Sequence, residues 1–400
     1  MGDIGLTAFS VFFMQSPSFL ANQRLLETGR GKSNCQSLFK IDKIPTDNHI
    51  RNMLDPALPS LLFPLFGEAI ELLGKYKAME DFQHLGGRVL IALDGSEYYC
   101  SKTICCEACQ RRKRNNGQLE YYHSMLSATI VAPGHNKVLP LEPEFITPQD
   151  GHDKQDCENA ATKRWLNAHA GQYQHLKPIY LGDDLMSRQP ICKAVQEVGA
   201  NFIFTAKPSS HKTMYEWIEG AELSTYTKTV KKGRSYSTYR YRWLNDIPLR
   251  DGKDALHVNW FEIEVVDRKG KITYRNSFVT DLDIDKGNVV ELAACGRARW
   301  KIENEQFNTV KNCGYHLEHN FGHGKQHLAA LLAAMNLLAF AFHTVCDLID
   351  EQWQKARKVI GARKYFFQNL LVITRYLVFP DWRTLIQTII DGQPPPELVG

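Results

Sequence analysis

The chain has 400 residues, more than one typical domain, so we expect one large core with appended or inserted parts. Hydrophobic residues make up 44% of the chain and charged residues 23%, which excludes a globally disordered protein. The formal net charge of +4 is compatible with a nucleic-acid partner but does not require one. The ten cysteines are scattered, so we expect reduced thiols in the cytoplasm rather than a secreted disulfide framework.

The first half of the chain predicts a helical region followed by an α/β core. Residues 1–86 carry apolar side chains at helical spacing, broken into short pieces by prolines. Residues 87–222 then predict the order β-β-β-α-β-α-β, with strands at 89–93, 121–132, 137–146, 178–181 and 201–206 and helices at 156–170 and 190–198. This order indicates antiparallel hairpins first and βαβ units later.

The second half predicts a β-rich insertion and a return to helices. Residues 223–282 alternate Thr, Tyr, Val, Ile and Phe between Lys-Gly and Asp-Gly turns. Residues 283–349 are predicted to be helical and to complete the core, and residues 350–400 to form a helical tail. The run 328–346 has no Asp, Glu, Lys or Arg, but its Asn336 and His343 favour a buried helix over a membrane span. We therefore expect no membrane partner.

Three acidic residues stand out by their context. Asp94 ends the first predicted strand, Asp183 ends the fourth, and Glu303 lies on the helix after the insertion. Three converging carboxylates provide the hard oxygen ligands that a pair of Mg²⁺ ions needs for displacement at phosphorus. Taken singly, an Asp-Gly after a strand is usually a turn, and a helical Glu is usually a solvated surface residue. The order of the three therefore matters more than any one of them.

The helix of Glu303 carries two cations that could position a phosphate backbone. Arg299 lies four residues before Glu303 and Lys311 eight after it. The simpler alternative is an ion pair on a surface helix, with little energetic weight. Two rival ligands also remain, Asp184 and Glu305. The glycine before Asp183 and the Arg299-Trp300 pair before Glu303 favour Asp183 and Glu303.

These motifs resemble those of insertion-sequence transposases with a DDE triad, which belong with retroviral integrases to the RNase H-like superfamily. The resemblance rests on Leu93-Asp94-Gly95, on Leu181-Gly182-Asp183, and on Arg299-Trp300-Lys301-Ile302-Glu303 with Phe307 and Lys311. The insertion at 223–282 is similar to one branch of these enzymes. So are the stretch from Gly314 to Lys325 and the run Gln149-Asp150-Gly151 with Lys154, Asp156, Cys157 and Glu158. The resemblance covers roughly residues 85–348.

The resemblance implies an α/β fold with an RNase H-like core, a β-rich insertion, and helical N- and C-terminal regions. It implies that Asp94, Asp183 and Glu303 bind Mg²⁺, with Mn²⁺ as a substitute, and that Arg299 and Lys311 contact DNA. The partners would be double-stranded DNA, as terminal inverted repeats and target, and a second copy of the chain on paired ends. Metal-activated water would cut one strand, and the freed 3′ hydroxyl would attack target DNA. The setting would be a bacterial-type cytoplasm, at the nucleoid.

The chain departs from the related signature at two positions. The signature has a tyrosine seven residues before the glutamate, where this chain has Gly296, and a lysine seven after it, where this chain has Val310. Lys311 follows one residue later. Two alternatives therefore stay open: a structure-specific nuclease without strand transfer, and a catalytically inactive DNA-binding derivative.

Basic residues alternate with tyrosines in the predicted insertion. Lys231, Lys232 and Arg234 lie there, between Tyr226 and Tyr236. Such a pattern suits a strand face laid along DNA, and we expect these three side chains to contact it. The alternative is an ordinary antiparallel sheet with a charged outer face. Residues 1–86 are a candidate DNA-end-binding region.

The loop that contains Cys106 and Cys109 leaves a metal site open. Zinc needs four ligands at settled spacing, and the sequence supplies one Cys-x-x-Cys with loosely placed companions, Cys100, Cys105 and His123. Four basic residues follow, at 111–114, so we favour a DNA-facing hairpin with free thiols over a zinc loop. The histidines at 316, 319, 323 and 327 lie among glycines that interrupt a helix, which favours cap, packing or DNA roles over a metal site.

Overall fold

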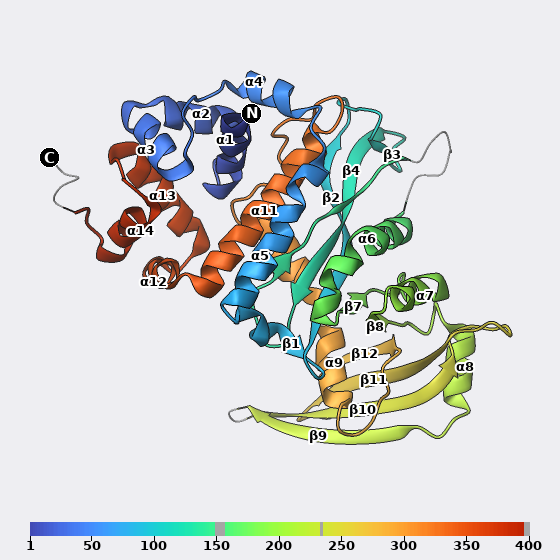
Figure 1. Ribbon diagram of the computed structural model, residues 1–400. Coiled ribbons are helices and arrows are strands. Elements are labelled where there is room, and N and C mark those ends of the chain that lie inside the picture. Colours follow the sequence, from blue (N-terminus) through green and yellow to red (C-terminus); the bar gives the residue numbers. More distant parts are fainter. Residues whose placement is uncertain (149–156, 233–234, 396–400) are drawn as a thin grey trace.

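The computed structural model describes residues 1–148, 157–232 and 235–395. It is a mixed α/β protein in which one large twisted sheet has helices on both sides (Figure 1). The strands are β1 (Gln83–His84), β2 (Arg88–Ser101), β3 (Gln110–Lys113), β4 (Leu119–Val131), β5 (Leu139–Pro140), β6 (Glu144–Ile146), β7 (Ile179–Gly182), β8 (Asn201–Thr205), β9 (Ser224–Lys232), β10 (Ser235–Pro248), β11 (His257–Asp267) and β12 (Ile272–Thr280).

The helices fall into three groups along the chain. The first group is α1 (Gly2–Phe13), α2 (Phe19–Glu27), α3 (Gly29–Phe39), α4 (Asp47–Leu54) and α5 (Pro64–Lys75), with 3₁₀ turns at Pro59–Leu62 and Ala78–Phe82. Between the strands lie α6 (Glu158–Tyr173), a 3₁₀ turn at Gln174–Leu176, α7 (Gln189–Glu197) and α8 (Lys212–Glu219). The last group is α9 (Val289–Arg297), a π-helix at Ile302–Phe307, α10 (Asn308–Asn312), α11 (Leu328–Ile349), α12 (Glu351–Ile360), α13 (Arg363–Tyr376) and α14 (Trp382–Asp391).

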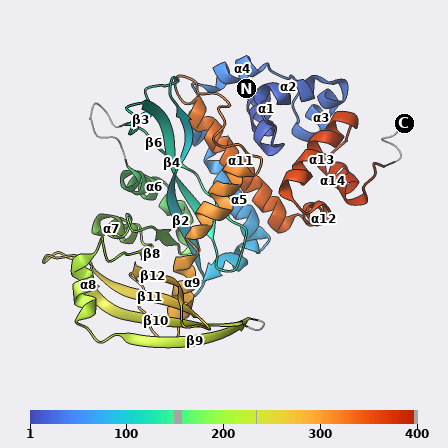
Figure 2. The same cartoon turned by 180° about the vertical axis from the view of Figure 1, so that it is seen from behind.

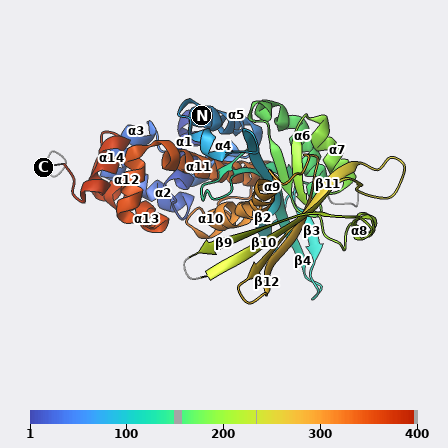
Figure 3. The ribbon, with the colours of Figure 1, turned by 90° about the horizontal axis from the view of Figure 1, so that it is seen from below.

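The centre of the sheet combines antiparallel and parallel pairing. The strand order is β3-β4-β2-β7-β8-β12-β11-β10-β9, and β5 and β6 pair with β4 beyond this path. Strand β2 is antiparallel to β4 and parallel to β7, and β7 is parallel to β8. Helices α6 and α7 pack against each other, with α6 over β2 and β4 (Figures 1 and 3), and α11 packs against β5 and α5.

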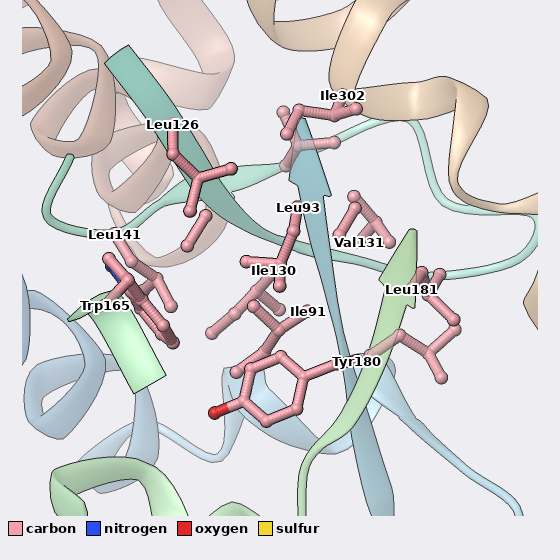
Figure 4. Packing of buried hydrophobic residues seen from close by; sticks show 14 of the residues in the cluster. Ile91, Leu93, Leu126, Ile130, Val131, Leu141, Trp165, Tyr180, Leu181 and Ile302 are labelled. Atoms are coloured by element: carbon pink, nitrogen blue, oxygen red, sulfur yellow. The ribbon is translucent and has the colours of Figure 1, made fainter. Parts of the chain in front are cut away.

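The core around β2 is apolar and closely packed. Ile91, Leu93, Tyr180 and Leu181 are fully buried, and the ring of Trp165 on α6 packs edge-on against Tyr180 (Figure 4). The near-continuous apolar runs of β2 and β7 are typical of strands covered on both faces. Such burial fixes where each strand stops, and therefore where the polar residues that follow it are placed.

The predicted insertion is a meander that continues the same sheet. Strands β9, β10, β11 and β12 pair antiparallel in sequence order, and β12 joins β8 through three residue pairs, from Phe278↔Thr205 to Thr280↔Ile203. Figure 2 shows this meander at the opposite end of the molecule from the two chain ends. The β-rich character predicted for 223–282 is confirmed.

The other predicted elements are confirmed with small shifts. The predicted helices at 156–170 and 190–198 correspond to α6 and α7, although residue 156 lies outside the described residues. The predicted strand 137–146 is two short strands, β5 and β6, because Pro140 and Pro143 remove the donors that a continuous ladder needs.

The apolar run near residue 330 forms the central helix of the helical end. By length and composition α11 could cross a membrane, but 83% of its most apolar window is buried inside the protein. It packs against α1 and α5, while α12, α13 and α14 form a second apolar cluster beside it. This burial is what a core helix requires, as predicted.

His343 on α11 makes the helical end sensitive to acid. Its ring is fully buried among Phe13, Trp353 and Phe367, and the Tyr315 hydroxyl lies 2.6 Å from its Nδ1. Burial, with repulsion from nearby arginine, holds the pKa of His343 well below its usual range. The folded protein therefore keeps this imidazole neutral, whereas the unfolded chain binds a proton below about pH 6.5.

We expect this histidine to lower the free energy of unfolding as the pH falls below about 6.5, by up to about 1.4 kcal/mol per pH unit. His343→Gln removes the proton-binding group, so its unfolding free energy, measured with urea from about pH 7 to about pH 5, should fall less steeply than that of wild type. The exposed His49→Gln is the control and should keep the wild-type slope. Equal slopes for wild type and His343→Gln would show that His343 is not responsible.

Candidate active site

Asp94 lies where β2 extends beyond its parallel neighbour. The pairing of β2 with β7 ends at Ala92↔Leu181, but β2 continues beside β4 as far as Ser101↔Tyr121. The prediction that Asp94 ends its strand is therefore wrong: Asp94-Gly95 is no turn, because Asp94 pairs with Ser127 inside the ladder. Asp94 nevertheless lies just beyond the last residue of β2 that pairs with β7, so it is at the edge of the parallel part of the sheet, as predicted.

Asp183 follows β7 directly, as predicted. Its Oδ1 accepts the backbone N–H groups of Leu185 at 2.9 Å and Met186 at 3.3 Å, which orders the turn. The rival Asp184 points elsewhere, since its carboxylate accepts the backbone N–H of Lys207 and the hydroxyl of Ser210. This geometry favours Asp183 over Asp184 as the residue that faces the site.

Glu303 lies on the π-helix that follows α9, and Arg299 links it to β2. The Arg299 guanidinium is 3.4 Å from Asp94 Oδ2 and 3.0 Å from Glu303 Oε1. Gln306, fully buried on the same π-helix, hydrogen-bonds the side chains of Ser127 and Thr129 on β4. The π-helix is thereby fixed to the sheet beside Asp94.

A fourth carboxylate, that of Glu158, joins this group. Glu158 is the first residue of α6, and a Cβ added at Gly95 would stand 2.1 Å from its Oε1. Only glycine at position 95 therefore leaves room for Glu158 beside Asp94. Glu158 belongs to the run that carries the resemblance, but its sequence context indicates no role, because nothing local reveals that α6 begins at this edge of the sheet.

The carboxylates perturb one another electrostatically. Burial raises the pKa of Asp94 to about 7, Arg299 opposes this, and the charges of Glu303, Glu158 and Asp183 add to it. Burial and Asp183 also raise the pKa of Glu158. Ionising several neighbouring carboxylates together is unfavourable because their negative charges repel one another. Such a cluster therefore indicates a place where a bound cation would be stabilising. Glu305 is not among the groups acting on Asp94 and lies near Lys301 instead, which favours Glu303.

The donor set suits divalent cations, although the carboxylates do not already form a closed cage. Carboxylate oxygens are the ligands that Mg²⁺ prefers. In the described part of the chain, only Cys106, Cys109, His123 and His323 bring three or more ligand atoms within 4.8 Å of one another. We call the sheet edge that carries Asp94, Asp183, Glu303 and Glu158 the acidic edge. There the guanidinium of Arg299 lies between Asp94 and Glu303 and supplies a positive charge.

The two predicted DNA-contacting cations of this helical region are both engaged within the protein. Arg299 is held by carboxylates, and Lys311 on α10 is 2.8 Å from Glu318. A π-turn accommodates one residue more than an α-turn. The π-helix at Ile302–Phe307 carries Glu303 and continues into α10, which carries Lys311.

The predicted cations of the meander are only partly described. Lys231 is exposed on β9, the edge strand. Arg234 lies outside the described residues, and so does the side chain of Lys232. On the next strand Arg240 and Arg242 pair with Glu264 and Glu262 of β11, as on an antiparallel sheet with a charged outer face. DNA contact at 231, 232 and 234 stays a prediction.

The cysteine loop has a partner that the sequence did not reveal. Cys106 and Cys109 lie beside His123 on β4 and beside His323, which follows α10, whereas Cys100 and Cys105 are not part of this group of ligand atoms. For His323 the sequence favoured a cap, packing or DNA role over a metal site; the fold places its ring beside the two thiols and His123, a contact that the sequence did not indicate. In the basic run that follows the loop, Arg112 pairs with Glu97 and Glu120.

Comparison with known proteins gives only weak likeness to solved structures. No known family profile matches this chain, and no curated protein matches it. Among solved structures, the piggyBac transposase in a synaptic complex with hairpin DNA aligns at a TM-score of 0.42. The sequences are 9% identical, and the alignment covers all of this chain and 77% of that one. A likeness at this level carries no functional argument, so the function rests on the geometry described above.

Gly296 has a packing reason to lack the side chain seen in related signatures. A Cβ there would stand 2.9 Å from the Phe278 ring and 3.1 Å from Ile203, and both of those side chains are buried. We expect Gly296→Ala to lower the free energy of unfolding by about 1–3 kcal/mol, because α9 must move off the sheet. The measurement is urea unfolding.

The matched control is Gly67→Ala on α5, where an added Cβ has nothing within 4 Å. It should stabilise the protein by up to about 1 kcal/mol, because alanine favours the helix. A Gly296→Ala variant as stable as Gly67→Ala would mean that α9 does not pack as closely as described.

Proposed function

We propose that this protein is a DDE-type transposase that cuts and joins DNA strands with divalent cations. The observation that carries the proposal is the meeting of Asp94, Asp183, Glu303 and Glu158 at one sheet edge, two of them bridged by Arg299. These side chains come from four separate elements: β2, the start of α6, the turn after β7 and the π-helix. Acidic residues that lack a shared task have no physical reason to converge at such an electrostatic cost.

The topology around this edge supports an RNase H-like core. If β2 is counted as the first strand, β4 as the second, β5 with β6 as the third, β7 as the fourth and β8 as the fifth, the central order is third-second-first-fourth-fifth. The pairs among the first three strands are antiparallel, and the pairs from β2 through β7 to β8 are parallel. In such a sheet, residues just past the ends of neighbouring parallel strands lie close together. Asp94 beyond the β2–β7 pairing and Asp183 after β7 fit that rule.

Each side chain has a distinct part in the proposal. Asp94, Asp183 and Glu303 would hold two Mg²⁺ ions, with Glu158 as an additional acidic neighbour. When bound, the ions supply activation of the attacking oxygen and stabilisation of the leaving oxygen. Arg299, which now pairs with Asp94 and Glu303, would contact a DNA phosphate once these carboxylates hold cations instead. Gln306 keeps the π-helix of Glu303 in place on β4.

The test is cleavage of a labelled DNA duplex that carries the ends of the surrounding genetic element, in Mg²⁺, with a supercoiled plasmid as target. We expect wild type to nick at the element end and to join that end to the plasmid. Glu303→Gln should lose cleavage by at least about a hundredfold, because an amide is a poor ligand for Mg²⁺. The matched control, Glu305→Gln, lies two residues away and should cut like wild type.

The other outcomes would change the proposal in defined ways. Loss of cleavage in Glu305→Gln but not in Glu303→Gln would move the third ligand by two residues. Nicking without any joined product would indicate a nuclease rather than a transposase. Binding to the ends without nicking by wild type would contradict catalysis and favour a DNA-binding derivative.

Gly95→Ala tests the part of Glu158 without touching a carboxylate. The new methyl group would occupy the position of the Glu158 carboxylate, whose flexible side chain can move away at small cost in stability. We expect cleavage to fall at least about tenfold while the melting temperature changes little. Wild-type cleavage by Gly95→Ala, at the same melting temperature, would remove Glu158 from the site.

A further inference from the structure

A second group of metal-ligand side chains lies away from the carboxylates, near the far end of β2 and β4. Cys106 and Cys109 come from the loop between β2 and β3, His123 from β4, and His323 from the segment between α10 and α11. Cys109, His123 and His323 are buried, and Cys106 is half-buried. Two thiols and two imidazoles therefore meet inside the protein from three places in the chain.

The distances within this group have the pattern of a tetrahedron. The two sulfurs are 3.8 Å apart, and the two Nε2 atoms are 3.2 Å apart. The sulfur-to-nitrogen distances are 3.6 Å for Cys106–His123 and 3.4 Å for both Cys109–His123 and Cys109–His323. A sulfur separation of this size is far from a disulfide, whose sulfurs are about 2.0 Å apart.

A zinc ion would produce the same set of distances. With Zn–S of about 2.3 Å and Zn–N of about 2.0–2.1 Å, tetrahedral geometry puts sulfurs about 3.8 Å apart, nitrogens about 3.3–3.4 Å apart, and sulfur about 3.5–3.6 Å from nitrogen. Each observed separation lies within about 0.2 Å of these values, the tolerance expected for a metal site. Hydrogen bonding alone would not impose this pattern on all four atoms together.

The surroundings orient the ligands for a metal. Nδ1 of His323 lies 3.0 Å from the carbonyl oxygen of Gly324, so an Nδ1–H donated there leaves Nε2 free to bind. The backbone N–H of Cys106 points to the sulfur of Cys109 at 3.4 Å. Tyr98 stacks on His123, and the Tyr99 ring lies 4.7 Å from the ring of His323, which limits access of water.

We propose that Cys106, Cys109, His123 and His323 form a structural Zn²⁺ site. Four protein ligands fill a tetrahedron and leave no position for a substrate, which is the property of structural rather than catalytic zinc. Two thiolates and two imidazoles also select zinc over Mg²⁺, which takes oxygen ligands. This site is independent of the proposed function, because it shares no residue with the acidic edge.

The position of His323 gives the zinc ion a mechanical role. The segment that carries His323 continues from the π-helix of Glu303 through α10, and it leads into α11. Its other fixed point is Asp55, whose carboxylate accepts the backbone N–H groups of Lys325, Gln326 and Leu328. A zinc ion would tie this segment to the outer end of β2 and β4, beside the short strand β3 that pairs with β4 from Gln110↔Tyr122.

The first measurement is metal content of the purified full-length chain by mass spectrometry. We expect about one zinc per chain in wild type. Cys106→Ser and His323→Ala should lose it, whereas the adjacent, exposed Cys105→Ser should retain it. Wild type without zinc, after refolding in its presence, would overturn the proposal, and so would zinc retained by both ligand variants.

A second measurement does not depend on whether ligand variants fold. Wild type in which Co²⁺ replaces the native ion should show the visible absorption of tetrahedral cobalt and a thiolate charge-transfer band, because two cysteines bind. Alkylation of Cys106 and Cys109 should be slow with the ion and fast after chelation, with Cys105 reacting equally in both states. Equal alkylation of all three cysteines before and after chelation would overturn the proposal.

Discussion

The mutual repulsion of four carboxylates at the end of β7 is the constraint around which this protein is organised. Burial makes the repulsion stronger, and three kinds of contact offset it: the guanidinium of Arg299, the backbone N–H groups that Asp183 accepts, and the anchoring of Gln306 on β4. Glycine at position 95 belongs to the same arrangement, because any side chain there would displace Glu158. The apolar core beneath the edge holds these parts rigid enough to stay together.

Much of the fold and the main acidic residues could be predicted from the sequence. Strands such as β2 and β7 are continuous apolar runs, the meander has turn residues at regular intervals, and α11 is uniformly apolar. Asp94, Asp183 and Glu303 were found because each follows or lies beside such an element. Signals of this kind are local, and local signals are what a single sequence carries.

The parts that could not be predicted depend on contacts between distant residues. His323 meets Cys109 across 214 positions of the chain, and no spacing within either segment indicates the other. The carboxylate of Glu158 reaches the acidic cluster only because the start of α6 packs beside Gly95. Arg242 forms an ion pair with Glu262, which lies on a neighbouring strand. The end of β2 was misplaced for a related reason: an Asp-Gly pair favours a turn locally, whereas eleven residue pairs with β4 extend the strand through it.

The three residue pairs between β8 and β12 have a consequence for how the protein assembles. The meander joins strands that follow one another along the chain, whereas β2 must find β7 after most of the preceding core has been made. Short loops close sooner than long ones, so the meander can fold as a unit before β12 pairs with β8. The acidic edge is completed only when the π-helix of Glu303 arrives from beyond the meander. During synthesis the four carboxylates therefore cannot meet until the chain beyond the meander, with Glu303, has been made.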